Sequence, residues 1–143
     1  MSYTQAIVQA LIDTLTRTAG LPAFQLAGHV PNLDFWMGEV RHAKTVLDDY
    51  KNRFDQMVAA QTAYDLNNPD PEAANRRRTH DYHYEPLKVA ITPEHANRFM
   101  RQLNAVAERL IERCLQEELI ELSKADELRE LAGLPPFDQE SSG

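Results

Sequence analysis

The chain has 143 residues and a net charge of −7, from 15 basic and 22 acidic side chains. A chain of this length forms one ordinary domain, and its 43% of hydrophobic residues is enough to build a buried core. The acidic balance argues against non-specific binding of nucleic acid or anionic membranes over the whole surface. Cys114 is the only cysteine, so an intrachain disulfide is excluded. With no long apolar run for a membrane span, we expect a cytoplasmic protein.

The first expected helix covers residues 3–18. Its inward face is predicted from apolar residues that recur every four positions: Ile7, Leu11 and Leu15. The connection that follows, residues 20–31, also contains large apolar side chains: Leu21, Phe24, Leu26 and Val30. Because such side chains are more stable away from water, we expect this connection to fold back over one end of the core.

Residues 33–66 are expected to form the longest helix. Large or apolar side chains recur three or four positions apart, which is the spacing of one helical face. They are Trp36, Val40, Ala43, Leu47, Tyr50, Phe54 and Met57. Asn32 is placed to accept hydrogen bonds from the first free amides of the helix. The run NNPDP ends the helix, because proline has no amide hydrogen and clashes with the preceding turn.

A second long helix is expected over residues 93–122. Thr92 is its predicted N-cap, and Pro93 occupies the first turn, where a missing amide hydrogen costs little. Its apolar stripe consists of Phe99, Leu103, Val106, Leu110 and Cys114. A short helix over residues 124–132 follows, and Gly133 is predicted to end it.

Oppositely charged side chains four residues apart on a helix form surface ion pairs worth about 0.2–0.5 kcal/mol. Asp49 with Arg53, and Glu94 with Arg98, have this spacing. We therefore expect both pairs to form on the solvent side of their helices.

Each of the four expected helices has a single apolar face that must be buried. The sequence therefore predicts an all-α fold, an antiparallel bundle of about four helices with two long ones. Residues 1–134 form this single domain, and residues 135–143 are predicted to be a disordered tail. The apolar stripe of the longest helix exceeds what the bundle can cover, so we expect a second copy of the chain to bury the surplus in a homodimer.

The connection between the two long helices, residues 67–92, is long for a bundle, whose loops usually need about 2–8 residues. It contains the stretch RRRTHDYHYEP. Apolar and polar residues alternate over residues 79–91, which is typical of extended chain. We interpret this part as a strap along the bundle and the protein as a non-catalytic interaction or structural module. The expected binding residues are Arg76, Arg77, Arg78, Tyr82 and Tyr84.

The same stretch allows an RNA-binding interpretation, in which the arginines contact phosphates and the tyrosines stack on bases. It also allows a metal site, for which His80, Asp81, His83 and Glu85 are potential ligands. The five glycines are scattered and form no phosphate-binding loop, so we expect no cofactor.

Arg78 and His83 have four residues between them, a spacing that resembles the arginine–histidine signature of HEPN-type helical-bundle ribonucleases. The resemblance implies metal-independent RNA cleavage at a dimer interface. The histidine would move the proton of the attacking hydroxyl while the guanidinium holds the phosphate. His80 is a possible substitute base in this alternative.

The ribonuclease alternative predicts that the purified protein cleaves RNA in the presence of EDTA. Cleavage should disappear in an Arg78→Ala variant of equal helical content, because the phosphate loses its cationic partner. Gel analysis of the two proteins tests this, and intact RNA with the unaltered protein rules the alternative out.

Overall fold

A computed structural model describes residues 3–67 and 92–135. Their elements in chain order are α1 (Tyr3–Ala19), α2 (Ala23–Ala27), the 3-10 turn η1 (Val30–Asn32), α3 (Leu33–Asn67), α6 (Pro93–Gln116) and α7 (Leu122–Ala132). All the regular structure in these residues is helical, and α3 and α6 are long. The prediction of an all-α protein with two long helices is therefore confirmed. The predicted extended segment 79–91 and residues 136–143 of the predicted tail lie outside the described residues.

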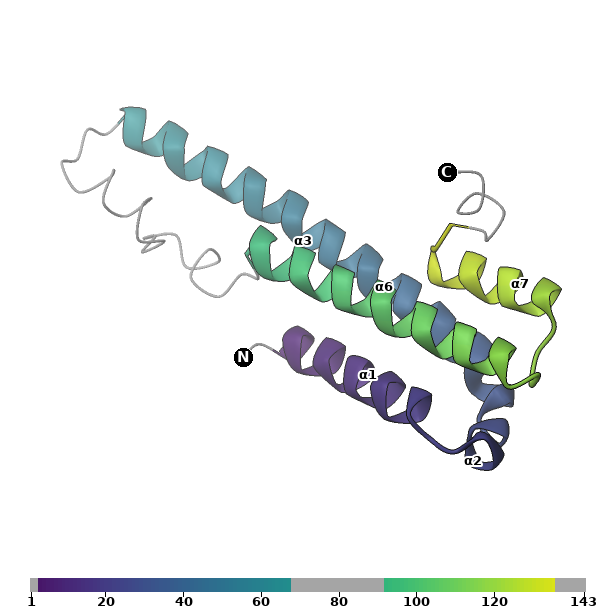
Figure 1. Cartoon of the computed structure of the whole chain (residues 1–143). Coiled ribbons are helices and arrows are strands. Elements are labelled where there is room, and N and C mark those ends of the chain that lie inside the picture. Colours follow the sequence, from purple (N-terminus) through teal and green to yellow (C-terminus); the bar gives the residue numbers. More distant parts are fainter. Residues whose placement is uncertain (1–2, 68–91, 136–143) are drawn as a thin grey trace.

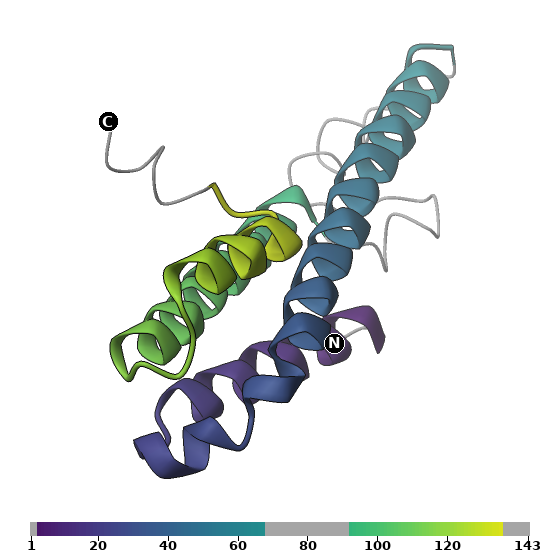
Figure 2. The ribbon, with the colours of Figure 1, turned by 90° about the vertical axis from the view of Figure 1, so that its right-hand side faces the viewer.

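Helix α6 lies at the centre of the molecule and packs against α1, α3 and α7. Helices α3 and α7 also contact each other, so α3, α6 and α7 form a three-helix core. The long helices alternate in direction along the chain, as the predicted antiparallel bundle requires (Figure 1). Helix α1 runs in the same direction as α6 and lies against it, while α3 passes behind α6 in Figure 1 and stands beside α6 and α7 in Figure 2. Because α1 has α6 as its main neighbour, it is only partly enclosed.

The buried face of α1 is formed by Val8, Ile12, Leu15 and Ala19. The prediction that Ile7 points inward is wrong, since its side chain is 50% exposed. Residues four positions apart advance by 40° beyond a full helical turn, so a strict four-residue series drifts across the face. A mixed spacing of four and three keeps α1 aligned with α6.

The connection between α1 and α3 folds over one end of the core, as predicted. Leu26 is fully buried, and Leu21 and Val30 pack against the core. The expectation for Phe24 is wrong, because its side chain is 77% exposed. Phe24 and Leu26 are two positions apart in the same helix, so only one of them can face the core. Asn32 belongs to the 3-10 turn that continues directly into α3, and it is therefore not the predicted N-cap.

The predicted apolar stripes of α3 and α6 face the core, and most of their residues are buried. Val40, Leu47 and Phe54 are buried on α3. On α6 the buried side chains are Leu103, Val106, Leu110 and Cys114. Phe99 is half-buried at the edge of the core. Thr92 accepts a hydrogen bond from the backbone amide of His95 at 3.2 Å, as expected of an N-cap.

Polar contacts join α3 to both α6 and α7. Lys124 donates to Asp34 at 2.8 Å, and this hydrogen bond raises the pKa of Lys124. Lys44 donates to the side chain of Asn104 at 2.7 Å. Burial, followed by the nearby charge of Arg41, lowers the pKa of Lys44. The contacts come from all three helices and therefore fix how the three-helix core is assembled.

The side chain of Arg129 on α7 is fully buried. Its Nη1 pairs with Glu108 on α6 at 3.0 Å, and its Nε donates to the carbonyl oxygen of Pro135 at 2.6 Å. A buried guanidinium is tolerated only when such partners replace water. The pair therefore sets the position of α7 along α6.

The second long helix ends at Gln116, six residues before the predicted end at 122. The backbone amide of Leu119 donates to the carbonyl of Cys114, and that of Glu118 donates to the carbonyl of Leu115. This is the Schellman arrangement of a helix end, and it places Glu118 in the left-handed region with φ of 57°. Helix α7 ends in the same way at Gly133, with φ of 75°, as the sequence predicted. The first end was missed because its left-handed residue is not a glycine.

The two helix ends make a matched pair for a stability test. Replacement of Glu118 by Gly should stabilise the fold by about 0.5–1 kcal/mol. A residue with a side chain is strained in the left-handed conformation, and glycine removes this strain. The gain exceeds the cost that comes from the greater flexibility of glycine in the unfolded chain. Replacement of Gly133 by Ala should destabilise it by about 1 kcal/mol, since its new Cβ would also lie 3.0 Å from Nζ of Lys44. Urea unfolding measures both, and changes of the same sign would contradict this account.

Candidate functional site

The site residues predicted from the sequence lie outside the described residues. They are Arg76, Arg77, Arg78, His80, Asp81, Tyr82, His83, Tyr84 and Glu85. The ribonuclease, metal-binding and strap interpretations of that stretch therefore stay predictions. The site that the described residues form lies elsewhere, on the side of α6 that faces α1.

Two open cavities follow each other along the seam between α1 and α6, with volumes of about 270 Å³ and 300 Å³. The first is lined by Gln5, Gln9, His95, Arg98, Phe99 and Gln102. The second is lined by Ile12, Thr16, Gln102, Ala105, Val106 and Arg109. Because Gln102 belongs to both, the cavities are two parts of one groove, which we call the α1–α6 groove.

The spacing of its residues explains how the sequence forms the α1–α6 groove. On α1 the lining residues are separated by four, three and four positions. On α6 they follow the same helical period from His95 to Arg109. These residues lie at the edges of the apolar faces that pack α1 on α6. Side chains at such edges cannot be enclosed without a third helix, so the seam stays open to solvent.

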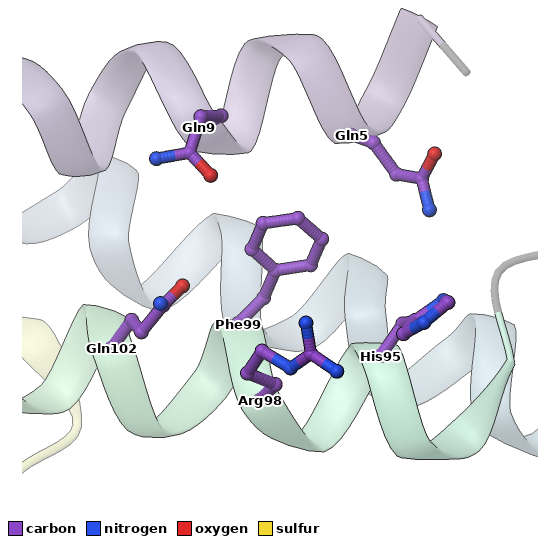
Figure 3. A pocket seen from close by; sticks show the side chains of 6 residues that line it. All are labelled: Gln5, Gln9, His95, Arg98, Phe99 and Gln102. Carbon is purple, nitrogen blue, oxygen red and sulfur yellow. The ribbon is translucent and has the colours of Figure 1, made fainter. Parts of the chain in front are cut away.

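Figure 3 shows how the side chains lie in the first cavity. Phe99 projects from α6 toward α1, between Gln5 and Gln9, which extend from α1 toward α6. His95 and Arg98 lie on the α6 side. Arg98 is about one helical turn from Gln102, and His95 is about two turns from it. The groove thus presents an aromatic ring surrounded by amide, imidazole and guanidinium groups.

Local hydrogen bonds hold several of these groups in place. The amide of Gln9 donates to Asp13 at 3.0 Å, and the hydroxyl of Thr16 donates to the carbonyl of Ile12 at 2.7 Å. At the far end, Nη1 of Arg113 donates to the carbonyl of Ala19 at 2.8 Å. This bond joins the last turn of α1 to α6. It closes the groove beyond Arg109.

The charge of the groove is opposite to that of the whole chain. Asp49 and Arg53 form the predicted ion pair at 2.9 Å, but the predicted pair of Glu94 with Arg98 is absent. Within the described ranges, no carboxylate lies within ion-pair distance of Arg98 or Arg109. The residues that line the two cavities include no Asp or Glu. The side chains that line the α1–α6 groove therefore carry net positive charge on an acidic protein, and the carboxylate of Asp13 lies beside them, where it accepts from Gln9.

The described part of the chain contains one thiol, that of Cys114. The thiol of Cys114 is fully buried, and this burial raises its pKa, so it is held in the unreactive protonated form. No group of three or more potential metal ligands occurs among residues 3–67 and 92–135. No helix in these ranges is both long and apolar enough to cross a bilayer.

Comparison with protein-family models, curated protein sequences and solved structures gave no match. Sequence reasoning missed the α1–α6 groove, although one signal was present. Arg98, Gln102, Ala105 and Arg109 recur three or four positions apart along one edge of α6, and the edge positions between the two arginines carry no acid. This signal was overlooked because Arg98 was expected to form an ion pair with Glu94. The neighbour of that edge, α1, cannot be deduced from the periodicity of either helix.

Proposed function

We propose that the chain is a non-catalytic interaction module that binds a segment of a partner protein in the α1–α6 groove. The observation that carries the proposal is the composition of the groove. Its apolar floor includes Ile12 and Val106, while amides and two guanidinium groups stand at its edges. An apolar surface with few polar groups of fixed position is typical of recognition sites.

The rigidity of the site also favours binding. Both walls are helices, and α6 is fixed by contacts with α3 and α7 on its other sides. The ordering of a preformed site costs little free energy when a partner binds. The buried thiol of Cys114 suits the reducing environment of the cytoplasm, which we propose as the location of the protein.

Filling the α1–α6 groove should abolish partner binding. Ala105 is exposed and lines the second cavity, so the indole of an Ala105→Trp variant would occupy the space that the partner needs. Ala10 is exposed on α1 and does not line either cavity, so Ala10→Trp is the matched control. Quantitative mass spectrometry of proteins captured from cell lysate should show partners held by the unaltered chain and by Ala10→Trp, and lost with Ala105→Trp.

Equal capture by all three proteins would contradict the proposal, provided that circular dichroism shows equal helical content. Loss of capture with both tryptophan variants would do the same, because the effect would not depend on the groove.

We propose in addition that the chain forms a homodimer through the far end of α3. The contact of Lys44 with Asn104 aligns the two antiparallel helices, so that α3 passes the first residue of α6 near residue 55. Residues 56–67, which we call the α3 arm, therefore extend about 18 Å further (Figure 1). Leu66 in this arm is 78% exposed. A second copy of the chain can cover such a surface by antiparallel helix pairing.

The dimer proposal is tested by sedimentation of two matched variants. Leu66→Ser should shift the chain toward the monomer, because an apolar contact is lost from the interface. Phe24→Ser should have no effect, since Phe24 is as exposed as Leu66 but lies at the opposite end of the molecule. A monomeric unaltered chain at micromolar concentration, or equal effects of the two changes, would exclude this interface.

A further inference from the structure

We propose that the α1–α6 groove selects an acidic amphipathic helix, with two carboxylates about eleven positions apart on one side of its apolar face. The inference rests on the proposed function and names the class of partner. It is carried by the charges of Arg98 and Arg109, which have no acidic partner among the described residues, by the helical spacing of the lining residues and by the length of the groove.

The shape of the groove fits a helix. Two helices that run side by side present a channel whose edges repeat every three or four residues, and the side-chain rows of a third helix fit such a channel. The lining residues of α6 extend from His95 to Arg109, a rise of about 21 Å. A partner helix of about 14 residues covers this length. Its apolar side would rest on Phe99, Ile12 and Val106.

The charges define which helix is favoured. Arg98 and Arg109 are eleven residues apart, which is three helical turns, so they lie on the same edge of α6 with a rise of about 16 Å between them. A partner helix that runs along α6 has the same rise per residue. Carboxylates eleven positions apart on its edge can therefore reach both arginines at once. Each such contact supplies the counter-charge that neither arginine has within the described residues.

The charge of the whole chain favours a polypeptide over a nucleic acid. A single-stranded nucleic acid carries one negative charge for every nucleotide, and the net charge of −7 repels such a polyanion. A helix with two or three carboxylates avoids most of this repulsion. The amide of Gln102 can donate to a carboxylate or to a polar side chain of the partner.

The experiment is a selection from a displayed library of amphipathic helical peptides whose edge positions vary among Glu, Gln, Lys and Ser. Peptides bound by the full chain should be enriched in Glu pairs eleven positions apart. The double variant Arg98→Gln/Arg109→Gln should bind the selected peptides about tenfold more weakly, because two charge-assisted contacts are lost. Arg17→Gln is the matched control and should leave the affinity unchanged, since Arg17 is exposed on α1 and does not line the groove.

The possible results separate this inference from the proposed function. Groove binders that are blocked by Ala105→Trp but show no acidic pair would overturn the inference and leave the interaction module intact. Failure to obtain any peptide that Ala105→Trp blocks would overturn both. Tighter binding of labelled polyuridine than of any peptide, lost in the double variant, would also overturn the inference and assign the groove to nucleic acid.

Discussion

The packing of the apolar face of α6 is the constraint on which the rest of the structure depends. Leu103, Ala107, Leu110 and Cys114 along this face are fully buried. The helix meets α3 and α7 on one side and α1 on the other. Burial of each leucine side chain contributes about 1.5–3 kcal/mol, so α6 cannot leave its position without loss of the whole core. The groove follows from the same arrangement, because α1 reaches α6 without a further helix to cover the seam between them.

The buried pair of Arg129 and Glu108 has a different role. Buried ion pairs contribute little net stability, because removal of the charges from water offsets most of their attraction. Removal of one partner is nevertheless costly, since it leaves a buried charge uncompensated. We infer that the pair specifies the register of α7 on α6. With α7 fixed on that side, the side of α6 that faces α1 is the one left available for a partner.

The sequence was most informative where a local rule decides the structure. The apolar period of α3 and α6, the N-cap at Thr92 and the left-handed residue Gly133 were all predicted correctly. The end of α6 was predicted wrongly, because its left-handed position is occupied by Glu118, a residue without a turn preference. Ile7 was placed in the core by a strict four-residue period and Phe24 by its hydrophobicity, but the helical geometry of α1 and α2 turns both side chains toward solvent.

The candidate site could not be derived in the same way. Its walls come from α1 and α6, which are separated by more than seventy residues and meet only in the folded chain. The pairing of Glu94 with Arg98 was a reasonable local expectation, yet Arg98 instead lines the groove. The predicted binding residues from Arg76 to Tyr84 remain a separate hypothesis, since they lie outside the described residues.

The central claim is that a partner helix binds between α1 and α6. Side-chain amide resonances of glutamine test it most directly, because Gln5, Gln9 and Gln102 line the groove while Gln25 and Gln56 are exposed on α2 and α3. Titration of the isotope-labelled chain with an acidic amphipathic peptide should shift the signals of the three groove glutamines and leave the other two unchanged. Shifts confined to Gln25 or Gln56 would contradict the account and move the binding surface to another part of the molecule.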